Sequence, residues 1–130
     1  MKAISTTAAP APAGHYSQAI VHGGIAYVSG QVPAHPDDRM RFKNAPIDAQ
    51  ARQVFANLDA VLAACGSSRA DVLRTTIYIT DIALWGTVNE IYAGFFGEHR
   101  PARTVVPSNP LRDGFLIEID AIAKLSESAG

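Results

Sequence analysis

The chain has 130 residues, of which 48% are hydrophobic and 18% are charged, and its formal net charge is −1. This size and composition predict one globular domain over residues 1–130 with a single core. The near-zero charge argues against a general polyanion-binding surface, and the single cysteine excludes an intrachain disulfide. No apolar run approaches the roughly 18 residues needed to span a bilayer, so no membrane contact is expected.

The N-terminal residues 1–14 are rich in Ala, Thr and Pro, and we expect them to form an extended arm. Pro10 and Pro12 interrupt any continuous apolar segment, so the arm lacks the hydrophobic region of a signal peptide. A cytoplasmic protein is the resulting expectation.

A β-hairpin is predicted next. Residues 16–21 and 25–29 have strand-like composition, and the tight turn at residues 22–24 contains two glycines. Gly30 follows, and residues 31–47 form a long loop. A loop longer than about 12–15 residues is unusual in a small domain and often lies near a functional site.

Two helices are predicted from apolar residues at helical spacing. Asp48 is expected to cap the first helix, and Gly66 stands where a helix-ending glycine belongs. The second helix is expected over residues 87–96, with Thr87 and Glu90 forming a capping box. The apolar stripes are Val54, Leu58, Val61, Leu62 and Cys65 in the first helix, and Val88, Ile91, Tyr92 and Phe95 in the second.

Three further strands are expected at residues 72–80, 102–106 and 115–123. In the first of them, Leu73, Thr75, Ile77 and Ile79 are expected to share one face.

The resulting order β-β-α-β-α-β-β predicts an α+β fold in which two helices cover one face of the sheet. The other face carries Tyr78, Leu116 and Ile122. Because a half-apolar sheet face needs a cover, we expect an oligomer that buries it.

Arg103 opens one expected strand, and Glu118 lies inside the last one. An arginine is costly to bury unless an anion meets it, and its planar guanidinium suits a carboxylate. If the partner is Glu118, the pair is structural. If the partner is the carboxylate of a small ligand, Arg103 marks a functional site.

Other charged residues give weaker signals. The basic run at residues 39–43 has Asp37 and Asp38 beside it, so we interpret it as a solvated loop instead of an RNA-binding segment. The four histidines have no metal-ligand spacing, and no metal site is predicted.

Several segments resemble the Rid family, also called YjgF. Its members are reactive-intermediate deaminases and are often described as endoribonuclease L-PSP or translation inhibitors. The resemblance covers residues 14–124, with the motifs in the family's order and spacing. The matching segments are Gly14-His15-Tyr16-Ser17-Gln18-Ala19, Val28-Ser29-Gly30-Gln31-Val32-Pro33, residues 49–54, residues 88–92, Pro101-Ala102-Arg103 and residues 117–123.

The resemblance implies a chorismate-mutase-like α+β fold and a homotrimer. Three sheets would line a central barrel, and three ligand clefts would lie between neighbouring subunits. The implied reaction is hydrolysis of enamines and imines, such as 2-aminoacrylate, to 2-oxo acids and ammonia, with no metal or organic cofactor.

The same resemblance implies roles for individual residues. Arg103 would clamp the substrate carboxylate, Glu118 would orient the attacking water, and Tyr16 would donate to the substrate or close the cleft. The remaining expected substrate-binding residues are Ser29, Gly30, Trp85, Asn89 and Val105.

The chain also departs from the family pattern. Val105 stands where the best-known branch has a cysteine, and residues 107–111 differ from the usual sequence. No thiol can therefore contact a ligand there, which leaves the substrate open. Two alternatives to an imine deaminase are kept: an endoribonuclease, and a non-catalytic protein that binds a small carboxylate.

Overall fold

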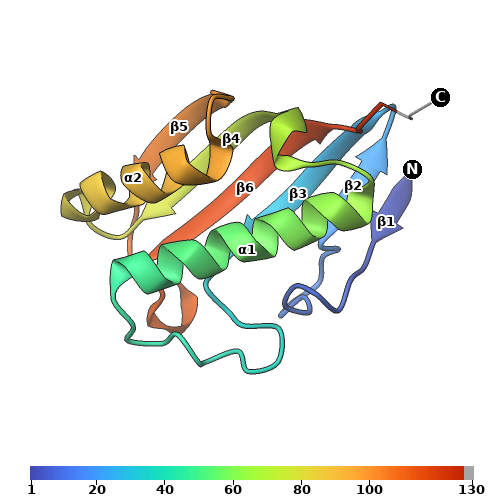
Figure 1. The fold of residues 1–130 in the computed structure, drawn as a ribbon. Coiled ribbons are helices and arrows are strands. Elements are labelled where there is room, and N and C mark those ends of the chain that lie inside the picture. The colour runs from blue at the N-terminus through green and yellow to red at the C-terminus, as the bar shows by residue number, and fades with distance from the viewer. Residues whose placement is uncertain (128–130) are drawn as a thin grey trace.

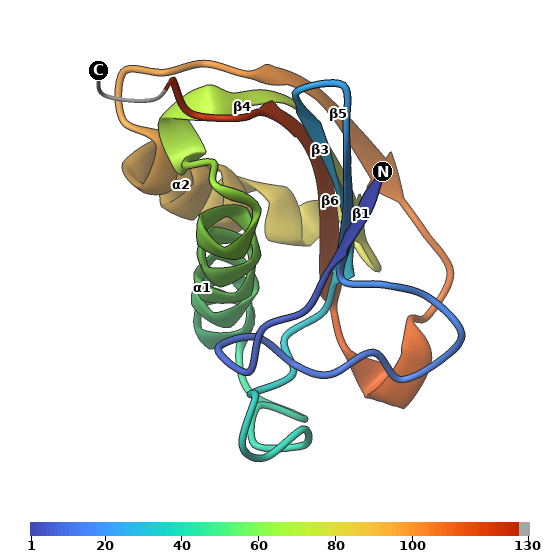
Figure 2. The ribbon, with the colours of Figure 1, turned by 90° about the vertical axis from the view of Figure 1, so that its right-hand side faces the viewer.

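The computed structural model describes residues 1–127, which form one six-stranded sheet with two helices packed on one face (Figures 1 and 2). This confirms the predicted α+β class with both helices on the same side. The elements are β1 Lys2–Ile4, β2 Ala19–His22, β3 Ile25–Gln31, α1 Ile47–Cys65, β4 Val72–Ile79, α2 Trp85–Phe96, β5 Ala102–Pro107 and β6 Ile117–Lys124.

The strands are ordered β1-β2-β3-β6-β4-β5 across the sheet. Only β4 and β5 run parallel, joined through the crossover helix α2, and the other neighbours are antiparallel. The core lies between the helices and the sheet. Its largest fully buried side chains include Leu58 and Leu62 of α1, Ile77 of β4, and Ile117 and Ile119 of β6.

The N-terminal arm is tied to the sheet. Its first residues form β1, which pairs with β2, and Ile4 is buried. The buried Gln18 side chain accepts from the backbone N–H of Thr6 and donates to the carbonyls of Thr6 and Pro10. The strand predicted from residue 16 therefore begins only at Ala19, and Tyr16 lies on a loop.

The predicted helix starts need correction. Pro46 precedes α1 without a side-chain cap, and Asp48 instead forms an ion pair with Arg52 at 3.2 Å. The capping box at Thr87 is also wrong, because a short 3₁₀ turn capped by Asp81 leads directly into α2 at Trp85. The helix-ending Gly66 is confirmed by its left-handed conformation (φ 79°).

Strand β4 has a bulge that the alternating pattern did not predict. The β4–β6 register shifts between Val72 and Arg74, so Val72 is buried and Leu73 is 46% exposed. The prediction that Leu73 shares the buried face of Thr75 is therefore wrong, because a bulge reverses the alternation at that point.

Neither α1 nor α2 covers the second sheet face, and in Figure 2 both lie on the opposite side of the sheet. Tyr78, Leu116 and Ile122 are half-buried there, and Tyr27 of β3 is 48% exposed. None of the helices in the described part of the chain is long and apolar enough to cross a membrane.

Candidate functional site

Arg103 lies on the helix face of the sheet, on the edge strand β5. It is in register with Thr75 of β4, which is buried and hydrogen-bonded to the Tyr92 hydroxyl of α2 at 2.9 Å. Arg103 Nη1 donates to Asn89 Oδ1 at 2.9 Å. The guanidinium carbon lies 4.7 Å from the ring centre of Trp85 and 4.9 Å from that of Tyr92.

These contacts orient the Arg103 guanidinium without cancelling its charge. A neutral amide and two aromatic faces hold it, and no carboxylate among residues 1–127 is within ion-pair distance of it. A cavity of about 460 Å³ opens beside it, lined also by Asn89 and Tyr92 and by His99. The arrangement presents a fixed cation to an anionic ligand.

Glu118 lies across a bulge in β3. The β3–β6 register shifts between Val28 and Gln31, which takes Ser29 and Gly30 out of regular pairing. A Cβ atom placed on Gly30 would overlap the carboxylate of Glu118 and lie 2.9 Å from its Cδ. A glycine is therefore needed at residue 30 for the Glu118 side chain to occupy this position.

The Glu118 carboxyl is half-buried and carries no ion pair within residues 1–127. Burial raises its pKa above the ordinary value, and the neighbouring Asp120 carboxylate raises it further. The pKa of Asp120 is itself raised, chiefly by burial. Glu118 can therefore hold or release a proton at a milder pH than an exposed glutamate.

Tyr16 and Ser29 border the same cavity as Glu118. The Ser29 hydroxyl donates to the Ser17 carbonyl at 2.6 Å, and the Ser29 N–H donates to the Gln18 carbonyl at 3.0 Å. Both Ser29 donors thus hold the loop that carries Tyr16, which is 50% exposed. The cavity measures about 340 Å³, and its lining includes Tyr16, Ser29, Gly30 and Glu118.

The predicted site residues therefore form two groups. Glu118 is in register with Tyr78 of β4, whereas Arg103 is in register with Thr75. Side chains alternate between the two faces along a strand, and residues 75 and 78 of β4 are separated by an odd number of positions. Arg103 and Glu118 therefore face opposite sides of the sheet. The alternative in which Glu118 neutralises Arg103 within one chain is wrong, because Arg103 bonds Asn89 instead.

Val105 belongs to the Arg103 group. It is in register with Ile77 of β4 and packs against the core. A side chain at residue 105 therefore lies on the helix face, one alternation beyond Arg103.

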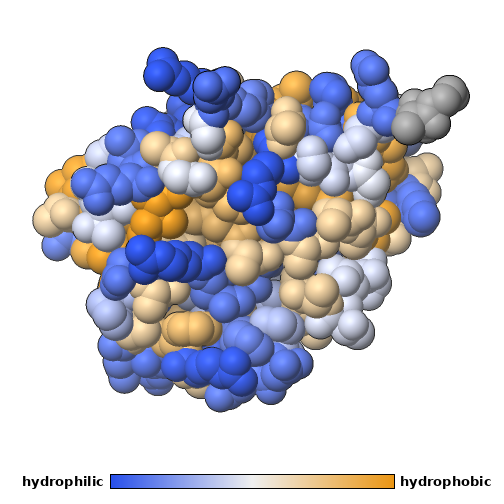
Figure 3. Space-filling model, viewed as in Figure 1, coloured by the Kyte–Doolittle hydropathy of each residue, from blue (hydrophilic) through white to orange (hydrophobic). Residues whose placement is uncertain are grey.

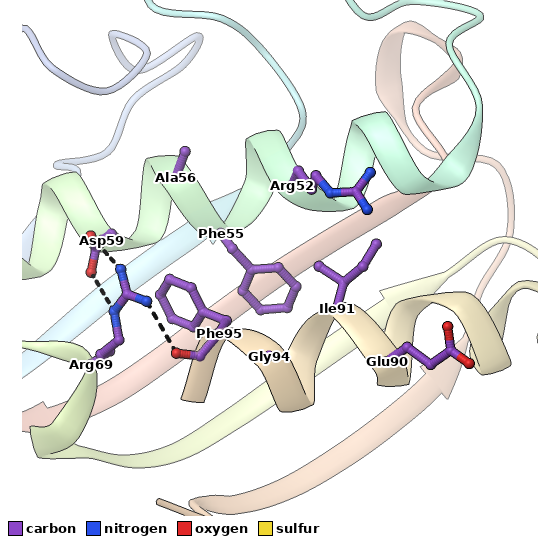
Figure 4. A pocket seen from close by; sticks show the side chains of 9 residues that line it. All are labelled: Arg52, Phe55, Ala56, Asp59, Arg69, Glu90, Ile91, Gly94 and Phe95. Carbon is purple, nitrogen blue, oxygen red and sulfur yellow. Dashed lines mark hydrogen bonds and ion pairs between the residues drawn. The ribbon is translucent and has the colours of Figure 1, made fainter. Parts of the chain in front are cut away.

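A groove of about 610 Å³ lies between α1 and α2, and its lining contains none of the predicted site residues (Figure 4). Its two arginines each have an aspartate partner. Arg69 bonds Asp59 and the Phe95 carbonyl and lies 4.1 Å from the Phe95 ring centre, and Arg52 pairs with Asp48. On the helix-side surface, hydrophobic residues gather where α2 lies (Figure 3).

Three residues near the two groups were not predicted as site residues. Tyr92 was assigned to an apolar stripe, yet its ring supports Arg103 and its hydroxyl bonds Thr75. Arg39 was assigned to a solvated loop, but it lines the Glu118 cavity together with Arg112. The only sequence signal for Arg39 was its position in the unusually long loop before α1.

The sequence model of the family described as Endoribonuclease L-PSP matches residues 6–125. The chain therefore belongs to this family, the YjgF/Rid family, as its motifs predicted.

Individual relatives agree with this assignment. A RutC family protein of Pyrococcus horikoshii is 43% identical over 120 residues, which cover 92% of this chain and 94% of that protein. A 2-iminobutanoate/2-iminopropanoate deaminase of Rattus norvegicus is 40% identical over 122 residues, covering 94% and 88%. The crystal structure of the YjgF gene product of E. coli matches with a TM-score of 0.89 at 38% identity, covering 95% and 98%.

Proposed function

We propose that the protein hydrolyses reactive imines and enamines of amino acids, of the 2-aminoacrylate kind, to 2-oxo acids and ammonia. The observation that carries this proposal is the oriented Arg103 guanidinium. It forms no ion pair with any carboxylate among residues 1–127. Its planar fork suits the carboxylate that every imino acid carries. The rat relative named as an imine deaminase supports the same activity.

The chemistry needs a positioned water and a proton acceptor. An enamine first takes a proton at carbon to give the imine. Water then adds across the C=N bond, and the resulting carbinolamine expels ammonia and leaves the C=O group. In the proposed mechanism Glu118 takes the proton from the attacking water, and Tyr16 donates to the substrate or closes the cleft.

We further propose that each site forms between two chains of a homotrimer. Within one chain Arg103 and Glu118 face opposite sides of the sheet, so one small ligand cannot contact both. An assembly that places the Arg103 edge of one chain against the Glu118 cavity of its neighbour removes this separation. Such an assembly would also give the sheet face opposite α1 and α2, with Tyr27 and Ile122, an apolar cover.

A coupled assay tests the activity. An amino-acid oxidase generates the imine of L-leucine, and semicarbazide traps the imine that has not yet been hydrolysed. Adding the protein is expected to lower the initial rate of semicarbazone formation and to speed ammonia release, and Arg103→Ala is expected to abolish both effects. Rates equal to those of the oxidase alone would leave a non-catalytic carboxylate-binding protein as the better description.

An endoribonuclease is the second candidate, because the matching family carries that description. Incubation with labelled single-stranded RNA tests it. The near-zero net charge leads us to expect no cleavage and little salt-dependent binding. Cleavage that disappears in Arg103→Ala would favour the nuclease.

A further inference from the structure

The Glu118 cavity contains two cations that the proposed deamination does not use. Arg39 comes from the long loop before α1, and Arg112 comes from the 3₁₀ turn Arg112–Gly114 before β6. Both line the same cavity of about 340 Å³ as Tyr16 and Glu118. Two guanidinium groups thus converge, from distant parts of the sequence, on the place where the water-activating carboxylate lies.

Arg39 is held in a defined position. Its Nε and Nη2 atoms both lie 3.0 Å from Asp113 Oδ2, and only 34% of its side chain is exposed. Asp113 itself has a left-handed backbone conformation, with φ 62°. A non-glycine residue in this conformation is uncommon and is maintained by its surroundings. One oxygen of Asp113 therefore orients the Arg39 fork toward the cavity rim.

Arg112 has a neutral partner. Its Nη1 atom donates to the Ala13 carbonyl at 3.3 Å, and no ion pair to Arg112 occurs among residues 1–127. Arg112 therefore brings a charge to the cavity that no anion of the described chain neutralises.

Glu118 does not neutralise these cations either. It makes no ion pair with Arg39 or Arg112, and its pKa is raised by burial and by Asp120 instead of being lowered by a nearby cation. The cavity lining thus contains two guanidinium groups and one carboxyl group that forms no ion pair with them. Arg39 is paired with Asp113, as Arg52 and Arg69 of the groove between α1 and α2 are each paired with an aspartate, whereas Arg112 has no ion pair among residues 1–127.

We propose that Arg39 and Arg112 bind a second anionic group of the substrate, so that the protein prefers imino acids with a side-chain carboxylate. This inference rests on the proposed deaminase function, in which Arg103 of the neighbouring chain holds the α-carboxylate. The distal carboxylate then lies in the Glu118 cavity, and Asp113 acts as a positioning residue for Arg39.

The test compares imines generated in place by oxidases of acidic and of neutral amino acids, namely L-glutamate and L-leucine. For the wild-type protein, kcat/KM is expected to be about 10-fold or more higher for the acidic imine, as fits charge-assisted hydrogen bonds. Arg39→Gln and Arg112→Gln are each expected to remove most of this preference, mainly through KM, while changing the rate on the neutral imine less than about 3-fold.

Two further variants sharpen the comparison. Asp113→Asn keeps a residue that tolerates the left-handed conformation but removes the charge that orients Arg39, so the preference is expected to decrease without loss of the fold. Arg41→Gln is the matched control. Arg41 lies in the same loop and pairs with Asp38, but it does not line the cavity, so the preference is expected to stay unchanged.

A binding measurement separates this inference from the proposed function. Calorimetric titration with 2-oxoglutarate and with 2-oxobutanoate uses the product analogues of the two substrate classes. Tighter binding of 2-oxoglutarate that is lost in Arg39→Gln supports the inference even if no imine is hydrolysed. Equal binding of the two acids, or a preference for the acidic imine that stays unchanged in both Arg39→Gln and Arg112→Gln, overturns it and leaves deamination standing.

Discussion

The partners of Arg103 are neutral, so the guanidinium is available to a ligand and is not required to balance a buried charge. Arg103→Ala is expected to abolish deamination while the melting temperature changes little. Loss of two charge-assisted hydrogen bonds, each about 1.5–3 kcal/mol, corresponds to a decrease in kcat/KM of about 10²-fold or more.

Arg103→Lys is the informative companion to this change. A point charge lacks the planar fork and cannot bond a carboxylate through two parallel N–H groups, so full activity should not return. Steady-state kinetics and thermal melting of both variants check the prediction, and wild-type rates in Arg103→Ala would remove Arg103 from the site.

The position of Glu118 depends on residue 30 having no side chain. Gly30→Ala is expected to displace the carboxylate, because the added Cβ would overlap it. We expect a loss of turnover approaching that of a Glu118 variant, with the fold retained. A crystal structure of Gly30→Ala with Glu118 in place and full activity would contradict this account of the bulge.

Glu118→Gln should lower turnover about 10²–10⁴-fold, since general-base assistance typically contributes that much. Binding of 2-oxobutanoate, which depends mainly on Arg103, should change little. If Glu118 had only a structural role, Glu118→Gln would instead lower the melting temperature, and the turnover rate would decrease only as far as the fold is lost.

The pH dependence provides a separate test of Glu118. Because its folded pKa is raised, the ionised base is lost as the pH falls through a value above the ordinary 4.5 of a glutamate. Asp120→Asn removes a nearby negative charge, so it lowers the pKa of Glu118 and should move the acid limb of kcat/KM to lower pH. An acid limb that does not move in Asp120→Asn would show that another group controls it.

At the scale of elements, most of the fold could be predicted because it follows from local periodicity. The apolar stripe of α1 and the glycine after it are local patterns, and the structure bears them out. In α2 the predicted Val88 and Tyr92 are buried, but Ile91 and Phe95 are only half-buried and Phe96 is buried instead. The two bulges, at Leu73 and at residues 29–30, could not be predicted, because they depend on the register with β6.

The candidate site residues were predicted from the family motifs, but their arrangement was not. Nothing local in the sequence shows that Arg103 and Glu118 face opposite sides of the sheet. The contact of Arg39 with Asp113 joins residues 74 positions apart, and the sequence gives no pattern for such a pair. Arg39 was therefore assigned to solvent although it lines a cavity.

The start of β4 is joined to the end of β6 through Asp71. Its carboxylate accepts from Lys124 Nζ at 2.7 Å and from the Ser126 hydroxyl, and these bonds lower its pKa from 3.8 to about 2. A lowered folded pKa stabilises the protein above the unfolded pKa, and this contribution is lost as the pH falls toward 2.

Asp71→Asn is therefore expected to lower the melting temperature at neutral pH. The difference from wild type should stay constant above about pH 4 and shrink between pH 4 and 2. Asp48→Asn is the control, because its exposed pair with Arg52 within α1 contributes only about 0.3–0.5 kcal/mol. A gap between wild type and Asp71→Asn that is the same at pH 2 and pH 7 would contradict the assignment.

For the whole molecule, the proposed trimer makes a prediction about mixed chains. Arg103→Ala and Glu118→Gln are each expected to be inactive alone. If every site takes Arg103 from one chain and Glu118 from its neighbour, each mixed trimer restores one of its three sites. Co-expression with two different tags, purification of mixed trimers and the coupled assay measure this fraction. No recovery in verified mixed trimers, or a stable monomer in sedimentation, would contradict the shared site.

The last strand among residues 1–127 is a central strand of the sheet, since β6 lies between β3 and β4. During synthesis, β3 and β4 therefore emerge with open edges and with no neighbour between them until residues 117–124 have been made. Because β6 pairs with strands made long before it, the core cannot close on the ribosome one segment at a time. The newly made chain must remain unaggregated until β6 has been made, and only then can the segments on either side of it pair.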